Sequence, residues 1–224
     1  MSGQTAVVIG STGMIGDLVV KQLIDDPTFT HVRLLVRRPI LFHESKIEVK
    51  LVNFEDPADM DQQMGSGDCI FCCVGTTQSK VKGDKNAYRK VDFDIPVNSA
   101  KTGLKNGFSK FLLVSAVGAN HDSGNFYLKL KGETEEALKK INFPSLHIFQ
   151  PSLLLGERNE SRITEKIAQV LMPAFSFMLA GKLKKYKPVK AMNVARAMVN
   201  AAKSEKKGIQ VYQYAEIEAL AQNH

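Results

Sequence analysis

Short apolar segments alternate with amphipathic stretches along most of the chain, and this alternation constrains the fold more than any other feature of the sequence. The apolar segments have the length of buried strands, and we expect strands at residues 6–9, 32–36, 47–52, 69–74, 111–115, 146–149 and 209–214. The segments between them predict helices at residues 14–24, 85–105, 127–140 and 194–202, and Asp56-Pro57 predicts the start of a short one. This order indicates an α/β fold, a doubly wound parallel sheet with helices on both faces.

The length of 224 residues fits a single domain, which we expect to span residues 1–224. Residues 151–190 interrupt the alternation, and we expect them to form a small C-terminal lobe on the substrate side of the sheet. Within this segment, the sequence leaves two interpretations open for one apolar group, either a wall of the substrate pocket or the core of the lobe. The group consists of Met172, Phe175, Phe177 and Met178.

A glycine-rich turn follows the first predicted strand and opens the first predicted helix. Its sequence is Gly10-Ser11-Thr12-Gly13-Met14-Ile15-Gly16. A turn of this kind points backbone N–H groups and the N-terminus of a helix at an anion. The first glycine permits the turn, the second lets a pyrophosphate approach, and the third lets the helix pack closely on the strand. The context predicts a dinucleotide site in a Rossmann fold, and the alternative is a structural turn without a ligand.

The end of the second predicted strand indicates which dinucleotide is bound. Sites that prefer NAD carry an acidic residue there, about 20 positions after the glycine turn, which binds the ribose 2′-hydroxyl. This chain carries Arg37 and Arg38 instead. A guanidinium group suits a 2′-phosphate by charge and by bidentate geometry. We therefore predict NADP(H) as the cofactor, although the two arginines are also compatible with solvated charges at the edge of the sheet.

Three polar residues form a candidate catalytic set. Ser115 ends the fifth predicted strand, and Tyr127 and Lys131 lie four positions apart in the next predicted helix, so their side chains share a face. The carboxyl ends of the strands face the cofactor cleft, which would bring Ser115 to Tyr127. A nearby ammonium group favours the phenolate form of tyrosine, and such a tyrosine can exchange a proton with a carbonyl or alcohol oxygen. We expect Ser115 to bind the same oxygen and Lys131 to reach the nicotinamide ribose.

The order of these motifs resembles the short-chain dehydrogenase/reductase superfamily, of the atypical or extended kind. Within it, the chain is most similar to the HIV Tat-interacting-protein-like oxidoreductases, which are also described as nucleoside-diphosphate-sugar epimerase-like. The resemblance covers nearly the whole chain. It rests on the glycine turn, Arg37-Arg38, Ser115, and the segments at residues 53–56, 71–77, 127–133, 150–158 and 194–198.

The resemblance implies further roles for single residues around an NADP(H)-bound Rossmann fold. It assigns Phe54 and Glu55 to the adenine. It assigns Gly75, Thr76 and Thr77 to the middle of the cofactor. It assigns Pro151, Leu153 and Leu154 to the nicotinamide amide. The chain departs from the family pattern at two places. Val74-Gly75-Thr76-Thr77 replaces the Asn-Asn-Ala-Gly of other members, and Gln150 stands where the family often has arginine.

The sequence thus predicts an NADP(H)-dependent oxidoreductase that transfers hydride between the nicotinamide and a small carbonyl or alcohol substrate, with Tyr127 as the general acid. One alternative is an NADPH-binding regulatory protein or redox sensor with little turnover. The other is an enzyme like a nucleotide-sugar epimerase or dehydratase, for which the segment at residues 151–190 is short.

The cysteine content and the hydropathy pattern bear on the compartment. Three cysteines cannot form a disulfide framework, no apolar run approaches the roughly 18 residues of a membrane span, and the N-terminus lacks the charged region of a signal peptide. We therefore expect a cytoplasmic protein. We interpret Cys69, Cys72 and Cys73 as buried small residues and predict no metal site, since no second pair of ligands lies nearby.

The formal net charge is +7, and five lysines gather between Lys182 and Lys190. This run indicates either a solvated face or a patch that attracts anionic substrates. No DNA- or RNA-binding motif accompanies it. We therefore expect a small-molecule substrate rather than nucleic acid or a membrane, leave protein partners open, and expect a monomer or a homodimer.

Overall fold

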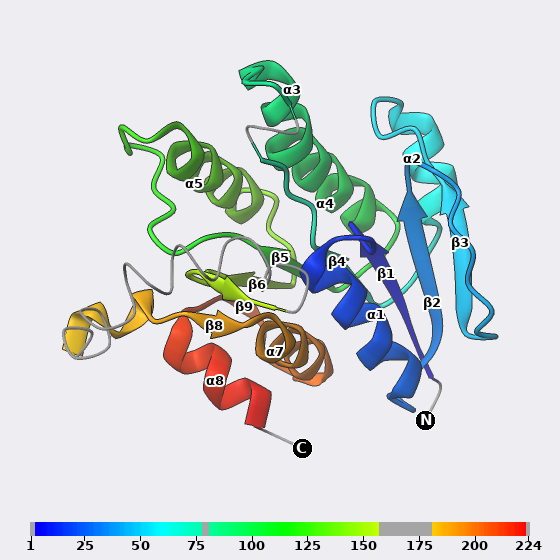
Figure 1. Ribbon diagram of the computed structural model, residues 1–224. Coiled ribbons are helices and arrows are strands. Elements are labelled where there is room, and N and C mark those ends of the chain that lie inside the picture. Colours follow the sequence, from blue (N-terminus) through cyan, green and yellow to red (C-terminus); the bar gives the residue numbers. More distant parts are fainter. Residues whose placement is uncertain (1–2, 78–80, 157–180, 223–224) are drawn as a thin grey trace.

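Seven parallel strands form the central sheet of the computed structural model, which describes residues 3–77, 81–156 and 181–222 (Figure 1). Their order across the sheet is β3-β2-β1-β4-β5-β6-β9. The strands are β1 (Gln4–Ile9), β2 (Phe29–Val36), β3 (Ile47–Leu51), β4 (Cys69–Cys72), β5 (Lys110–Val114), β6 (Ser145–Phe149) and β9 (Gly208–Tyr212). The chain therefore starts near the middle of the sheet, builds one edge, and returns beside β1 to build the other half. The predicted doubly wound α/β fold is confirmed.

Helices cover both faces of this sheet (Figure 1). One layer contains α1 (Met14–Asp25), α7 (Ala191–Lys203) and α8 (Tyr214–Gln222), and the other contains α2 (Pro57–Met64), α4 (Ile95–Lys105) and α5 (Phe126–Lys139). Each layer has its own apolar core. None of the helices in the described ranges is both long and apolar enough to cross a membrane.

The strands read as continuous apolar runs because both faces of the sheet are buried. Along β1, Val8 points into the core under α1 and α7, whereas Val7 and Ile9 point into the core under α2, α4 and α5. The same alternation separates two of the cysteines, and Cys73 is half-buried rather than buried as expected. Cys72 is buried in the second core, and Cys73 packs against the first.

The C-terminal end of the chain differs from the sequence prediction. The last strand ends at Tyr212 rather than at residue 214, and Tyr214 begins helix α8, which the sequence analysis missed. The Glu216 side chain accepts a hydrogen bond of 3.0 Å from the Gln213 backbone N–H. A glutamate in the first turn that reaches back in this way stabilises the start of a helix. The spacing of Gln213 and Glu216 was the available signal.

Residues 85–105 form one continuous helical segment, as predicted, but its hydrogen bonding changes in the middle. The segment begins as α3 (Lys85–Arg89), passes through a π-helical turn at Lys90–Asp94, and continues as α4. Pro96 lies at the start of α4. A proline has no backbone N–H and cannot complete the usual helical hydrogen bond to the fourth residue before it, which is Asp92. A π turn at such a position frequently marks a functional site.

A second, two-stranded parallel sheet lies outside the main one. It pairs β7 (Leu154–Leu155) with β8 (Val189–Lys190), and the short 3₁₀ helix at Gly181–Tyr186 precedes β8. That residues 151–190 form a substrate-side lobe stays a prediction. The apolar group at Met172, Phe175, Phe177 and Met178 lies outside the described residues.

A histidine is buried within the sheet. His147 on β6 is fully buried, with Nε2 2.8 Å from Ser145 Oγ and Nδ1 2.9 Å from Tyr212 Oη. Burial, and then the charges of Lys110 and Lys206, lower the pKa of His147 to about 4. The imidazole is therefore neutral in the folded protein at neutral pH.

We expect His147 to make stability depend on pH. The unfolded chain binds a proton at this histidine as pH falls below about 6.5, whereas the folded chain resists it until about pH 4, so stability is lost across this window. Between pH 7 and pH 5 the loss is about 2 kcal/mol, at about 1.4 kcal/mol per pH unit below 6.5. Urea unfolding of His147→Gln should show a decrease smaller by that amount, while the exposed His43→Gln behaves like the wild type. Equal decreases in the wild type and His147→Gln would contradict this assignment.

Candidate active site

The glycine turn lies where the strand order reverses, between β1 and β4. Gly10 has a positive φ of 85°, and a Cβ atom there would come within 2.8 Å of the backbone of Cys73 and Val74. A Cβ atom at Gly16 would lie 2.1 Å from the Gly10 carbonyl oxygen. Only glycine fits either position. The turn that the sequence predicts is therefore required by the close approach of the chain after β4 and of helix α1.

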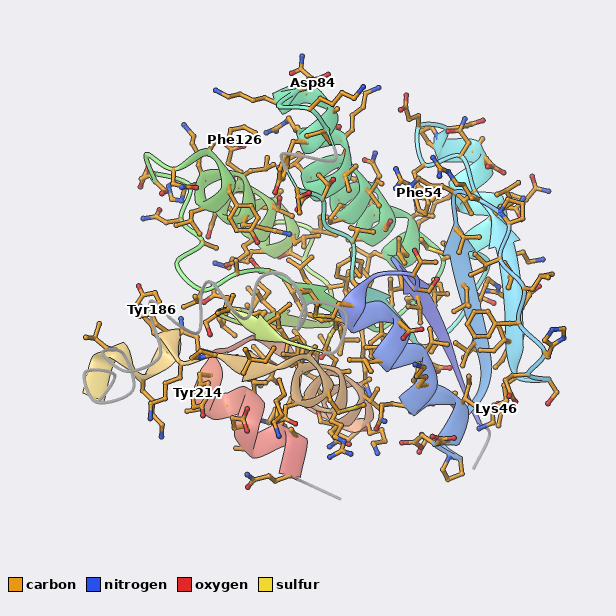
Figure 2. The ribbon with its side chains drawn as sticks, in the orientation of Figure 1. Lys46, Phe54, Asp84, Phe126, Tyr186 and Tyr214 are labelled. Atoms are coloured by element: carbon orange, nitrogen blue, oxygen red, sulfur yellow. The ribbon has the colours of Figure 1, made fainter. Side chains whose placement is uncertain are left out.

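Three adjoining cavities form a groove along the carboxyl edge of the sheet. Their volumes are about 680, 500 and 520 Å³. Arg37 and Phe54 line both the first and the second, and Gly13 and Gly75 line both the second and the third. Phe54 and Tyr186, which lines the third cavity, lie on opposite sides of the molecule in Figure 2. A long, narrow ligand would span this groove.

All but one of the predicted cofactor-binding residues line the groove. Phe54 and Glu55 line the first cavity. The second is lined by Gly10, Ser11, Thr12, Gly13, Arg37, Arg38, Phe54 and Gly75. The third is lined by Met14, Ile15, Thr76, Lys131, Pro151, Leu153 and Leu154, together with Gly13 and Gly75. Thr77 follows Thr76 in the chain but lines none of these three cavities.

The turn between Gly10 and Gly13 has the chemistry of an anion site. The Ser11 side chain is buried and lines the second cavity, and its Oγ has no hydrogen-bond partner within the described part of the chain. A buried hydroxyl group without a partner is costly unless a ligand supplies one. Arg37 and Arg38 are exposed at the rim of the same cavity. These residues fit the phosphates of a dinucleotide.

Ser115, Tyr127 and Lys131 line the third cavity together. Ser115 directly follows β5, and its N–H donates to the Phe149 carbonyl oxygen at 2.7 Å. Tyr127 lies in the first turn of α5 and is half-buried. Lys131 follows one turn later, with Nζ 5.9 Å from the centre of the Tyr127 ring. The three residues that the sequence singled out therefore meet at one end of the groove.

A buried carboxylate, Asp92, pairs with Lys131, and the sequence analysis missed it. The Lys131 ammonium lies 2.9 Å from Asp92 Oδ1, with both side chains almost fully buried. Asp92 Oδ2 accepts a hydrogen bond of 2.9 Å from the Thr76 N–H. Burial by itself would lower the pKa of Lys131, but Asp92, together with Tyr127 and Cys72, outweighs burial and the pKa is raised. Lys131 is therefore held as an ammonium ion.

The π turn places Asp92 opposite helix α5. Because Pro96 offers no N–H to the Asp92 carbonyl oxygen, that oxygen is left to the Thr134 hydroxyl, 3.0 Å away. Thr134 Oγ1 also lies 2.8 Å from the Leu130 carbonyl oxygen in its own helix. Asp92 lies at helical spacing from Tyr88 and Ser99, which are also buried, but the sequence alone does not show this burial.

Two further titratable groups near the groove, Tyr88 and Cys72, have structural roles. The Tyr88 hydroxyl donates to the Thr76 carbonyl oxygen at 2.8 Å, and burial raises the pKa of Tyr88. Burial also raises the pKa of Cys72 to about 12, so the thiol stays protonated and unreactive. In the predicted basic run, Lys184 and Lys190 are exposed and do not line the three cavities.

Comparisons of the whole chain agree with this geometry. A family model described as NAD(P)H-binding matches residues 10–205. The protein HTATIP2 of Rattus norvegicus is 30% identical over 203 residues, which cover 89% of this chain and 81% of that protein. The mitochondrial protein FMP52 of Candida albicans is 33% identical over 201 residues, which cover 87% of this chain and 86% of that protein. These matches confirm the resemblance drawn from the sequence.

Solved structures share the fold. WbmH of Bordetella bronchiseptica, solved with NAD⁺, superposes with a TM-score of 0.71 at 15% identity, over 94% of this chain and 76% of that chain. The UDP-N-acetylglucosamine 4-epimerase of Methanobrevibacter ruminantium, solved with UDP-N-acetylmuramic acid, gives 0.70 at 15% identity, over 95% and 77%. At such low identity the likeness shows the Rossmann arrangement alone.

We expect the ion pair between Asp92 and Lys131 to behave as a unit. Asp92→Asn should lower the free energy of unfolding by about 3–5 kcal/mol, because it leaves a buried ammonium group without its counterion. Adding Lys131→Met should recover part of this loss, since the second substitution removes the buried charge. Urea unfolding measures both effects.

A matched control exists at the exposed ion pair between Asp61 and Lys105, whose charged atoms lie 2.7 Å apart. Asp61→Asn should change stability far less than Asp92→Asn. If Asp92→Asn were no more harmful than Asp61→Asn, the buried pair would not carry the role assigned to it.

Proposed function

The chain belongs to the NAD(P)H-binding family, and on that basis we propose that it is an NADP(H)-dependent oxidoreductase acting on a small carbonyl or alcohol substrate. One observation carries the proposal. Ser115, Tyr127 and Lys131 line a single cavity at the end of a groove whose other end is lined by Phe54 and Arg37. A dinucleotide bound along the groove would bring its reactive ring to the end where the three polar side chains meet.

The bound cofactor would supply or accept the hydride, and residues of the chain would donate or accept the proton. Tyr127 Oη would donate a proton to the carbonyl oxygen during reduction and take it back during oxidation. Lys131, kept charged by Asp92, would hold a positive charge beside Tyr127 and reach the nicotinamide ribose. Ser115 would hydrogen-bond the same substrate oxygen.

The preference for NADP(H) rests on the rim of the second cavity. Arg37 and Arg38 are exposed there, at the point where an acidic residue would bind a free 2′-hydroxyl. Two guanidinium groups favour a phosphate at this point and offer no acceptor to a hydroxyl. We therefore propose NADP(H) rather than NAD(H).

The proposal includes the setting of the enzyme. We propose a small-molecule substrate, a monomer or homodimer as the working form, and the cytoplasm as the compartment. The relatives named FMP52 are described as mitochondrial, so fractionation of cells that express the tagged protein is the direct test of the compartment.

Tyr127→Phe should lower turnover at least about 100-fold, because it removes the hydroxyl that moves the proton. Binding of NADPH, followed by titration calorimetry, should change little, since the ring is retained. Tyr214→Phe, on the half-buried start of α8, is the matched control and should keep full turnover. Unchanged turnover in Tyr127→Phe would overturn the assigned role.

Substitution of both Arg37 and Arg38 by serine should weaken NADPH binding by about 10–100-fold, the loss expected for charge-assisted hydrogen bonds. NADH binding should change little, because NADH lacks the 2′-phosphate. Arg196→Ser, at an exposed position on α7, controls for a change in net charge. Equal affinity of the wild type for NADH and NADPH would contradict the cofactor assignment.

A screen of aldehydes, ketones and quinones, followed by the loss of NADPH absorbance, separates this proposal from the alternatives. Turnover supports an oxidoreductase. Tight NADPH binding with no turnover favours a regulatory protein. A separate product assay that finds nucleotide-sugars interconverted without net NADPH loss favours an epimerase-like enzyme.

A further inference from the structure

A chain of buried and half-buried polar side chains is hydrogen-bonded to Ser115, and its other members do not line the third cavity. Ser115 Oγ is hydrogen-bonded to Glu135 Oε1, and Gln150 Nε2 lies 3.0 Å from each of the two Glu135 carboxyl oxygens. Gln213 Nε2 in turn donates to Gln150 Oε1 at 2.9 Å. These residues come from the ends of β5, β6 and β9 and from helix α5. The mechanism described above uses only Ser115.

Glu135 has no cation as a direct partner among the described residues. Its side chain is buried, and its partners from β5 and β6, Ser115 and Gln150, are both neutral. The charged groups that act on it, Lys139 and Glu136, both belong to its own helix, and they pair with each other at 2.7 Å. The π turn also packs against α5, but its carboxylate, Asp92, pairs with Lys131.

This environment favours the neutral form of the carboxyl group. A buried carboxylate without a paired cation is costly, since hydrogen bonds from neutral groups replace only part of its hydration. Burial raises the pKa of Glu135, and the hydrogen bonds from Ser115 and Gln150 oppose this only in part. Neither Ser115 nor Gln150 supplies a positive charge that would hold Glu135 in the charged form.

The protonation state of Glu135 then decides whether the Ser115 hydroxyl can donate a hydrogen bond into the cavity. A serine hydroxyl group has one proton to donate. If Glu135 is ionised, it accepts that proton, and Ser115 can only accept hydrogen bonds in the cavity. If Glu135 is neutral, its own proton bridges the two side chains, and the Ser115 proton is free to point into the cavity.

We propose that Glu135 is a positioning residue that acts through Ser115, its neutral carboxyl group donating to Ser115 Oγ so that the Ser115 hydroxyl donates to a substrate oxygen. This inference rests on the proposed function for the identity of that oxygen. No bond other than hydrogen bonds changes, and the proton stays on Glu135 during the reaction.

Gln213 fixes which end of the Gln150 amide faces Glu135. Because Gln213 donates to Gln150 Oε1, the amide of Gln150 turns its NH₂ group toward Glu135. This NH₂ group lies 3.0 Å from both Glu135 oxygens and cannot accept a hydrogen bond, so Ser115 Oγ is the partner that can accept one from the acid proton of Glu135. Gln150 adds no positive charge beside Glu135, and its hydrogen bonds oppose the effect of burial only in part.

The state of Glu135 can be measured without a substrate. In the full-length protein labelled with ¹³C at the glutamate carboxyl carbons, Glu135→Gln identifies the Glu135 signal by its loss. We expect this signal to titrate at higher pH than the exposed glutamates of the same protein. Ser115→Ala, which removes a donor to the ionised form, should move the midpoint higher still.

The neighbouring Glu136 is the matched control. Its pKa is lowered by the hydrogen bond from Lys139, so the signal lost in Glu136→Gln should titrate at lower pH. A Glu135 midpoint at or below that of the exposed glutamates overturns the proposal. Because Ser115→Ala leaves Glu135 in place, it tests the same contact even if Glu135→Gln fails to fold.

The consequence for turnover is tested separately. Carbonyl reduction by the wild type should fall to a lower plateau, by about tenfold or more, as the pH rises through the Glu135 midpoint, because ionised Glu135 accepts the hydrogen bond that the Ser115 hydroxyl would otherwise donate to the substrate. Glu135→Gln should lose this decline, since an amide NH₂ group can donate to Ser115 Oγ at every pH. In the Ser115→Ala background, Glu135→Gln should change neither rate nor pH profile.

An effect of Glu135→Gln that persists in the Ser115→Ala background, or an unaltered pH profile, overturns the action through Ser115. If no carbonyl compound is reduced at all, the proposed function fails, while the carboxyl titration still decides the state of Glu135. The two failures are therefore distinguishable.

Discussion

Parallel pairing of all seven strands places their carboxyl ends along one edge of the sheet, and the candidate site depends on this constraint. After β3 the chain returns to the other side of β1, so the loops after β1 and β4 leave the sheet in different directions and the groove lies between them. Gly10 follows β1 and packs against the chain after β4, and Ser115 follows β5. Residues more than 100 positions apart thereby line one groove. Glycine is needed at position 10 because any side chain would push these strand ends apart.

Two buried carboxyl groups flank the catalytic end of this groove and differ in their partners. Asp92 faces the ammonium group of Lys131 and also accepts a hydrogen bond from the Thr76 N–H, in the loop after β4. Glu135 faces Ser115 and a glutamine amide. The pair of Asp92 and Lys131 holds a positive charge beside Tyr127. In our proposal, the contact between Glu135 and Ser115 sets the direction in which the Ser115 hydroxyl proton points. Helix α5 carries members of both, so its packing against the π turn sets their geometry together.

Local patterns account for much of the fold and of the candidate site. The glycine turn, the arginines at the end of β2 and the spacing of Tyr127 and Lys131 are visible in a few neighbouring residues, because turns and helix faces are set by short-range geometry. Helix α8 escaped prediction because its start, at Tyr214, continues the apolar composition of β9. Asp92 and Glu135 escaped because a charged residue on a helix gives no sign of its partner until the helices are packed.

The sequence by itself therefore determined most of the strands and helices and their order along the chain, the glycine turn, and the residues to which the proposed chemistry is assigned. Only the tertiary structure decided which carboxyl group meets Lys131 and which meets Ser115. Those contacts join β5, β6 and the π turn to α5, over separations of 15 to 42 positions in the chain. The electrostatic state of a buried group depends on all the groups around it, and sequence spacing does not encode that surrounding.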